Sequence, residues 1–416
     1  MSIIRSKDVV DIILKTLGIV DPDISRHGEI TAYLLYKLLK KSDIEFTKQE
    51  LLDYVLIGLL HDIGLYQGDV ALKESESEEP GPHSLYGYLF VKFLSPLGDK
   101  ADIIKYHHVN LNRYSMLQMD EKDKKVLKYL SVVDKMEQFR SGILPSTYFK
   151  EKRDITFSGH VFDLFMELEA KEHVLENLGN GSYKEEMNHF WQTNPMNERY
   201  KDKFLEMLVY TIDFRSEVTV IHTMSTVNFA EQLGKLLRLS PEEINHIHYG
   251  ALLHDLGKIA IPLKILESTS RLSDKEMEVM KSHVKVTEYI LEDFIHPVVL
   301  QLAVRHHEKL DGSGYPYGLE EKDLTLSQQI IAVADILSAL YSKRSYKESF
   351  DKEKIISILQ SDIKGKKISV PVVVALMANY DSVIKKYERK KSEIMGIYFN
   401  IKKDYEDLSE IFKNIV

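Results

Sequence analysis

Two short sequences, His61-Asp62 and His254-Asp255, each end an apolar run and are followed two positions later by a glycine. Imidazole and carboxylate groups are ligands for divalent transition metals, and one aspartate can bridge two ions about 3.5–4 Å apart while its histidine neighbour binds one of them. A water held between two such ions loses a proton near neutral pH and becomes a nucleophile. A single dipeptide is weak evidence, so this chemistry depends on further ligands around both.

Further histidines and aspartates surround the two dipeptides in the same order. Each dipeptide has one histidine before it, and it is followed by a lone histidine, an adjacent histidine pair and an aspartate within an apolar segment. Ten of the 16 histidines belong to this double series, which predicts a duplicated domain with a binuclear metal centre in each copy. The first series is His27, His61, Asp62, His83, His107, His108 and Asp134, and the second is His222, His254, Asp255, His283, His306, His307 and Asp335.

The composition narrows the metal and the partners. The 416 residues include no cysteine, which excludes disulfides, iron–sulfur clusters and thiolate zinc sites and leaves nitrogen and oxygen ligands that favour iron or manganese. The net charge of −9 argues against a general nucleic-acid surface. No signal peptide and no apolar run near the ~18 residues of a membrane span are visible, so we expect a cytoplasmic protein.

Helical periodicity dominates the elements that must position these side chains. Apolar residues recur at i, i+3 and i+4 spacing, and alternating strand patterns are scarce, so we predict an all-α fold. Capping-box sequences at Thr47…Glu50 and Ser240…Glu243 open the two helices that end at the His-Asp dipeptides. We therefore expect helices of equal length before both dipeptides.

The predicted layout has four parts: an N-terminal domain over 1–140, a helical connector over 141–215, a core over 216–350 and a helical extension over 351–416. In the extension, apolar residues from Tyr387 to Phe412 follow 3/4 spacing. This spacing fits either the seam of a homodimeric coiled coil or a long C-terminal helix packed on its own chain.

The second copy carries additional groups suited to a phosphate. A glycine-rich turn, Asp311-Gly312-Ser313-Gly314-Tyr315-Pro316, follows His306-His307-Glu308, and its glycines let the backbone approach a ligand closely. Lys258, four residues after His254, can reach a phosphate oxygen as a point charge. Arg344 and Lys347 become candidates for the same anion beside a metal centre.

These motifs resemble those of the HD-GYP domain, a branch of the HD phosphohydrolases. The resemblance covers residues 216–350 and implies an all-helical, metal-dependent phosphodiesterase that opens cyclic di-GMP to the linear dinucleotide and in some members continues to GMP. It further implies that the second series holds the metals with Asp255 as the bridge, that Lys258 holds the scissile phosphate, and that Gly312, Tyr315, Pro316, Arg344 and Lys347 contact substrate. Val218, Ser338 and Ser345 depart from the family pattern, and Val218 favours two metals over three.

The first copy looks like an HD domain without the GYP signature, so the chain resembles tandem HD-domain helical bundles. Leu65 replaces the lysine, Val109-Asn110-Leu111-Asn112-Arg113 replaces the glycine-rich turn, and Asp23 is a candidate extra ligand. Two interpretations remain open: a second phosphohydrolase, or a regulatory module that retains metal. The acidic residues Glu74, Glu76, Glu78 and Glu79 favour regulation, because they would repel a dinucleotide.

The function that we predict is hydrolysis of a cyclic dinucleotide, first cyclic di-GMP, by attack of a metal-bridging hydroxide on phosphorus. Two alternatives stay open. The substrate is another cyclic dinucleotide such as cyclic GMP-AMP, or the chain is a cyclic-dinucleotide-binding signalling module with little turnover.

Overall fold

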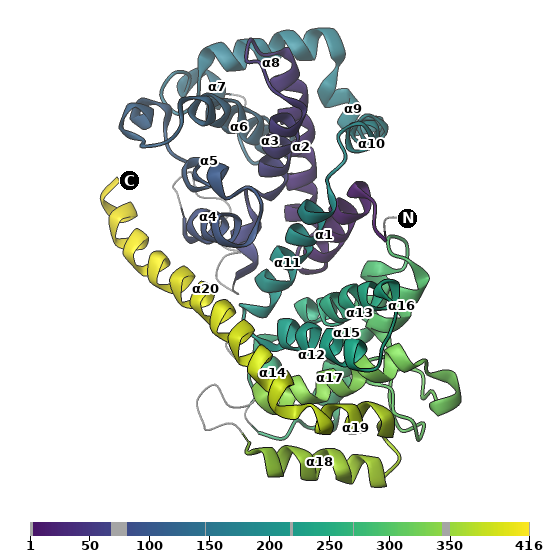
Figure 1. Cartoon of the computed structure of the whole chain (residues 1–416). Coiled ribbons are helices and arrows are strands. Elements are labelled where there is room, and N and C mark those ends of the chain that lie inside the picture. The colour runs from purple at the N-terminus through teal and green to yellow at the C-terminus, as the bar shows by residue number, and fades with distance from the viewer. Residues whose placement is uncertain are drawn as a thin grey trace. The chain divides into compact units, whose positions relative to one another are not determined.

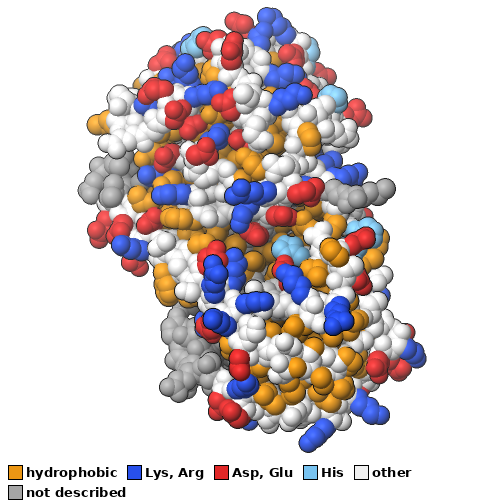
Figure 2. All heavy atoms as spheres, viewed as in Figure 1, with side chains coloured by type: hydrophobic (Ala, Val, Ile, Leu, Met, Phe, Trp, Pro, Cys, Tyr) orange, Lys and Arg blue, Asp and Glu red, His pale blue; other side chains and the backbone are white. Residues whose placement is uncertain are grey.

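The computed structural model describes residues 3–67, 81–145, 147–216, 219–268, 270–342 and 350–415. Within these ranges the chain folds into helices joined by turns and loops, and it forms no β-strand (Figure 1). The all-α prediction is confirmed. On the face shown in Figure 2, side chains of both charge signs are spread among apolar ones. None of the helices in the described ranges is long and apolar enough to cross a membrane.

The described residues divide into two compact units, which we call the N-terminal and the C-terminal unit. Most of the N-terminal unit lies within Val20–Met207, and most of the C-terminal unit lies within Leu208–Asn400. Each unit buries its own core of Leu, Ile, Val and aromatic side chains. Both helices at the chain's ends, α1 (Ser6–Val20) and α20 (Tyr380–Ile415), contribute residues to both units.

Six elements occur in the same order in the two units, with short helical segments such as α14 (Leu263–Leu266) between some of them. In the N-terminal unit they are α2 (Pro22–Lys41), α3 (Lys48–Leu60), the 3-10 turn η1 (Ile63–Gln67), α4 (Pro82–Leu94), α5 (Asp102–Tyr106) and α6 (Glu121–Arg140). In the C-terminal unit they are α12 (His222–Leu236), α13 (Pro241–Leu253), the 3-10 turn η5 (Leu256–Ala260), α15 (Asp274–Leu291), α16 (Pro297–Val304) and α17 (Leu326–Ser342).

The packing of these elements also repeats. In the N-terminal unit α2 packs against α3 and α6, and α4 packs against η1 and α5. In the C-terminal unit α12 packs against α13 and α17, and α15 packs against η5 and α16. The two units therefore place corresponding helices, and the residues that these helices carry, in corresponding positions.

Both predicted capping boxes form. The Thr47 hydroxyl accepts a hydrogen bond from Glu50 N at 3.2 Å, and the Glu50 carboxylate accepts one from Thr47 N at 2.8 Å. Ser240 and Glu243 make the same pair of bonds at 3.2 and 2.9 Å. Each box fixes the start of a 13-residue helix, so α3 and α13 both end one residue before their His-Asp dipeptide.

The remaining helices are outside this repeat. The predicted connector folds into the helices α7 (Tyr148–Glu151), α8 (Gly159–Glu172), α9 (Val174–Asn180), α10 (Tyr183–Thr193) and α11 (Glu198–Asp213). Beyond α17 come α18 (Lys352–Lys364), α19 (Val370–Ala378) and α20, which is 36 residues long (Figure 1). Tyr387, Ile394 and Tyr398 on α20 are buried within the chain itself, which favours a helix packed on its own chain.

The glycine two positions after each dipeptide aspartate allows a close backbone approach. A Cβ atom at Gly257 would lie 1.9 Å from His283 O and 2.7 Å from Thr287 N, and one at Gly64 would lie 1.9 Å from His83 O. Thr287 Oγ1 also accepts a hydrogen bond from Gly257 N at 2.9 Å. The 3-10 turn therefore touches the next helix directly, which fixes the following histidine relative to the dipeptide.

We expect Gly257→Ala to lower the free energy of unfolding by about 1–3 kcal/mol, because the turn must move away from α15. Denaturant unfolding measures the change in stability. Metal analysis measures the loss of bound metal that a displaced His283 would cause. Gly179→Ala on α9 is the matched control, since its Cβ meets no atom within 4 Å. Equal stability of the two variants would contradict the close-approach argument.

Candidate metal centres

The two His-Asp dipeptides lie where a helix ends and a 3-10 turn begins. His254 is the C-cap of α13, and Asp255 leaves the helix with φ −105° and ψ 9°. Consecutive residues within a helix do not normally face a common target. Because the helix ends at His254, the two side chains converge, and His254 Nε2 lies 3.1 Å from Asp255 Oδ2.

The two carboxylate oxygens of Asp255 face different pairs of histidines. Asp255 Oδ2 lies 3.3 Å from His222 Nε2 and 3.1 Å from His254 Nε2. Asp255 Oδ1 lies 3.3 Å from His283 Nε2 and 4.0 Å from His306 Nε2. One oxygen for each of two ions is the arrangement that a bridging carboxylate requires.

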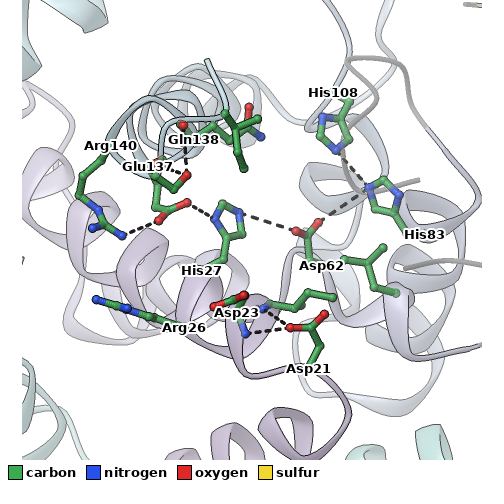
Figure 3. Close-up of a pocket in the computed structure, with 14 residues that line it drawn as sticks. Asp21, Asp23, Arg26, His27, Asp62, His83, His108, Glu137, Gln138 and Arg140 are labelled. Atoms are coloured by element: carbon green, nitrogen blue, oxygen red, sulfur yellow. Dashed lines mark hydrogen bonds and ion pairs between the residues drawn. The ribbon is translucent and has the colours of Figure 1, made fainter. Parts of the chain in front are cut away.

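Asp62 repeats this arrangement in the N-terminal unit. Asp62 Oδ2 lies 3.7 Å from His27 Nε2 and 3.4 Å from His61 Nε2. Asp62 Oδ1 lies 3.8 Å from His83 Nε2 and 3.4 Å from His107 Nε2. Figure 3 shows Asp62 between His27 on one side and His83 on the other.

The last members of each series complete the clusters. Asp335 Oδ1 lies 3.1 Å from His222 Nε2, and Asp335 Oδ2 lies 3.5 Å from His307 Nδ1. In the N-terminal unit Asp134 Oδ1 lies 3.2 Å from His27 Nε2, and His108 Nε2 lies 3.1 Å from His83 Nε2. The structure thus brings together all seven predicted ligands in each unit.

Backbone carbonyls orient several of the histidines. The Nδ1–H groups of His61, His107, His254, His283 and His306 each donate to the carbonyl three residues earlier, at 2.5–2.8 Å. Because a carbonyl only accepts, these bonds place a proton on Nδ1, so Nε2, which faces the aspartates, is the nitrogen that a metal ion can use. This is the orienting contact that metal-bound histidines require.

The first histidine of each series has a different partner. His222 Nδ1 lies 3.0 Å from Ser338 Oγ, and the Ser338 hydroxyl donates to His222 O at 2.9 Å. His27 Nδ1 lies 2.7 Å from Glu137 Oε2. Ser338 and Glu137 each follow their cluster's last aspartate by three residues, one turn along α17 or α6. In the sequence Ser338 stands out only as a departure from the family pattern, and no motif marks Glu137.

The residues present fit a pair of divalent ions in each unit. Among the described residues, four groups of side chains have ligand atoms within 4.8 Å of one another, two groups in each unit. Buried His254 Nε2, Asp255 Oδ1, His107 Nε2 and Asp62 Oδ1 make no hydrogen bond within the described residues. Unsatisfied polar atoms at this depth are costly, and a metal ion is a partner that would satisfy them.

The pKa values of the C-terminal cluster show what competes for its ligands. Burial lowers the pKa of His307 to about 3 and holds that of His306 well below its usual range, so both rings are neutral and able to bind metal. Burial also disfavours a proton on His254, but the Asp255 and Asp335 carboxylates outweigh it and raise the His254 pKa to about 10. His254 therefore holds a proton where a metal would bind.

Lys258 lies at the C-terminal cluster and forms an ion pair with Asp255 Oδ2. At the corresponding place in the N-terminal unit Leu65 is buried. The N-terminal unit has a different lysine at its cluster, because the buried Lys135 Nζ lies 3.8 Å from Asp134 Oδ2. Lys135 was not predicted from the sequence, where its place directly after a cluster aspartate is the signal that could have identified it.

The glycine-rich turn borders the C-terminal cluster. The Tyr315 ring lies 4.6 Å from the His307 ring, and Pro316 follows it in the same turn. Gly312 has a φ of +76°, a conformation that glycine adopts without strain. The buried Glu308 carboxylate accepts hydrogen bonds from Tyr317 N at 2.7 Å and Leu319 N at 2.9 Å, which holds the turn in place.

Some predicted positions lie outside the described residues. These are Arg344, Lys347 and Ser345 after α17, Val218 before α12, and Glu74, Glu76, Glu78 and Glu79 between η1 and α4. Their roles stay predictions.

Comparison with known proteins gives several matches. Residues 206–367 match a family model described as HD domain. A 3'3'-cGAMP-specific phosphodiesterase 1 of Vibrio cholerae is 25% identical over 390 residues, which cover 88% of this chain and 90% of that protein. A crystal structure of a cyclic GMP-AMP-specific phosphodiesterase from Vibrio cholerae has a TM-score of 0.54 at 16% identity and covers 91% of this chain and 98% of that one, which shows a shared fold.

Two further relatives match only part of the chain. A cyclic di-GMP phosphodiesterase of Thermotoga maritima is 33% identical over 199 residues, and a cyclic di-GMP phosphodiesterase response regulator of Xanthomonas campestris is 38% identical over 192. These matches cover 47% and 44% of this chain, and they span about half of each relative, 54% and 49%. The predicted HD-GYP resemblance of the C-terminal half is confirmed, and the N-terminal HD domain stays a prediction.

We expect Ser338→Ala to weaken metal binding in the C-terminal unit by about 10–100-fold, because His222 loses the group that orients it. Titration against a metal chelator measures the affinity. Ser361→Ala, at an exposed position on α18, is the control. Unchanged affinity in Ser338→Ala would contradict an orienting role.

Metal affinity should rise with pH between about 6 and 8. In this range His254 carries a proton in the metal-free protein, and the metal must displace it. Each proton released contributes about a tenfold gain in affinity per pH unit. Calorimetric titration with Mn²⁺ in buffers of different ionisation enthalpy measures the number released, and a pH-independent affinity would contradict this account.

Proposed function

We propose that this chain, which carries an HD domain within residues 206–367, is a metal-dependent phosphodiesterase that hydrolyses cyclic dinucleotides in its C-terminal unit. The observation that carries the proposal is the two-sided placement of Asp255 between histidine pairs, with Lys258 and Tyr315 at the same cluster. The named activities of the relatives support the same reaction class.

The ligands of the C-terminal centre in this proposal are those of the second series: His222, His254, Asp255, His283, His306, His307 and Asp335. A pair of divalent ions bound there supplies Lewis acidity to phosphate oxygens and a water acidified enough to attack phosphorus near neutral pH. The absence of cysteine and the imidazole and carboxylate donors favour iron or manganese.

The chain's own residues position the reactants. Asp255 keeps its carboxylate ionised, because His254 and Lys258 outweigh the effect of burial and hold the Asp255 pKa well below its usual range. Lys258 is a fixed cation beside the centre, and its ammonium can turn from Asp255 to a phosphate oxygen and stabilise charge in the transition state. Tyr315 and Pro316 supply a wall next to His307, and Gly312 lets the turn approach the ligand.

The substrate that the family resemblance favours is cyclic di-GMP, hydrolysed to the linear dinucleotide. A specific observation supports cyclic GMP-AMP as a second candidate: the relative that matches 88% of this chain is named a 3'3'-cGAMP-specific enzyme. The relatives named for cyclic di-GMP match about half of the chain or less. Parallel kcat/KM measurements on the two cyclic dinucleotides decide between these substrates.

We expect Asp255→Ala to abolish turnover of cyclic dinucleotides, because both ions of the C-terminal centre lose a shared ligand. Product analysis by chromatography and metal analysis of the purified Mn²⁺-loaded protein measure the effect. Asp62→Ala is the matched control, since it makes the same change in the other unit and leaves the C-terminal centre intact.

Full activity of the metal-loaded Asp255→Ala variant would overturn the proposal. Tight binding of a cyclic dinucleotide by the wild-type protein with no product would instead support the signalling-module alternative. If Asp62→Ala lost its activity while Asp255→Ala kept it, the reaction would be assigned to the N-terminal unit.

A further inference from the structure

A pocket of about 470 Å³ opens at the cluster of the N-terminal unit (Figure 3). Its volume lies within the range of small-molecule sites. Asp62, His83 and His108 lie on one side of it, and Arg26 and Arg140 lie on the other, with His27 between the two sides. A ligand in this pocket would therefore face the candidate metal centre and two guanidinium groups.

The two guanidinium groups have hydrogen-bonding capacity to spare. Arg140 Nη2 donates to Glu137 Oε1 at 2.7 Å, while its Nε is buried without a partner within the described residues. Arg26 is exposed, and among the described residues no carboxylate forms an ion pair with it. Each guanidinium carries five N–H donors in a planar fork that matches the oxygens of a phosphate.

The carboxylates around the pocket are largely engaged. Asp21 caps α2 and accepts hydrogen bonds from Asp23 N at 2.8 Å and Ile24 N at 3.4 Å. Glu137 is held between His27 and Arg140. With divalent ions at Asp62 and its histidines, positive charge lies on both sides of the pocket, which favours an anion.

The rest of the lining suits an organic group attached to that anion. Ile24, Leu65 and Ile143 offer apolar surface, and Asp23 offers an exposed carboxylate for N–H donors of the ligand. Leu65 occupies the place that Lys258 has in the C-terminal unit, so the positive charge of this pocket comes instead from α2 and α6. Arg26 and Arg140 thus place two cations at a pocket that has no counterpart of Lys258.

We propose that this pocket is a second ligand site, separate from the centre that hydrolyses cyclic dinucleotides, and that it binds a nucleotide through a terminal phosphate held by Arg26 and Arg140 beside the N-terminal centre. The site does not depend on turnover in the C-terminal unit, so the two proposals can fail independently.

The test uses the full-length Asp255→Ala protein loaded with Mn²⁺, in which the C-terminal centre is disrupted. Calorimetric titration with GMP should show one site per chain. Guanosine, which lacks the phosphate, should not bind, and inorganic phosphate should bind at least tenfold more weakly than GMP. Equal binding of guanosine and GMP, or of inorganic phosphate and GMP, would overturn the nucleotide assignment.

Substitutions locate the site. Arg26→Ala, at an exposed side chain, and Arg140→Gln should each weaken GMP binding about tenfold or more, because a charge-assisted bond to the phosphate is lost. Arg199→Ala, at an exposed arginine of the same unit outside the pocket, should bind as the parent does. Metal analysis of each variant checks that the N-terminal centre is unchanged.

Unchanged GMP affinity in Arg26→Ala with full metal content would overturn the proposal, whatever the result for Arg140→Gln. Cyclic-dinucleotide turnover by the wild-type protein, measured in parallel, reports separately on the function proposed for the C-terminal unit.

Discussion

One carboxylate placed between two pairs of histidines is the constraint on which the rest of the structure depends. Asp255 must offer one oxygen to His222 and His254 and the other to histidines on α15 and after α16. The helix before it therefore ends at His254, and the turn after it passes close enough to α15 that only glycine fits at 257. The N-terminal unit meets the same constraint with Asp62 and Gly64.

The sequence predicted the candidate ligands better than it predicted the groups that orient them. Histidine and aspartate types recur in one order at similar spacing, and capping boxes fix the helix lengths, so the all-α fold and both clusters could be anticipated. The bonds that orient the rings go mainly to backbone carbonyls, which no residue type reveals. Arg26 and Arg140 reach one pocket only because α2 packs against α6, a pairing that local patterns do not specify.

The two units place the same types of predicted ligand in the same arrangement and differ in the residues around them. The first histidine is oriented by neutral Ser338 in one unit and by the Glu137 carboxylate in the other. A carboxylate partner makes an imidazole a more basic ligand, so His27 would bind a metal ion more strongly than His222 would. The basic side chains near the two clusters also differ. The C-terminal unit has Lys258, whereas the N-terminal unit has Lys135 and the two arginines of the pocket. The two units therefore share the geometry of the His-Asp clusters and differ in the charged groups around them.

Protonated His254 and Lys258 both pair with the Asp255 carboxylate in the C-terminal unit, and a metal ion would compete with them for it. Without metal, Asp255 is balanced by protonated His254 and by Lys258, and these groups offset the cost of a buried charge. A divalent ion held by Asp255 would supply that positive charge instead, and His254 would have to lose its proton and Asp255 would hold Lys258 less strongly. In the proposed reaction the Lys258 ammonium would then be available to a phosphate oxygen of the substrate. Metal binding and the freedom of Lys258 would therefore be linked through Asp255, because one carboxylate charge cannot fully balance both a divalent ion and the ammonium.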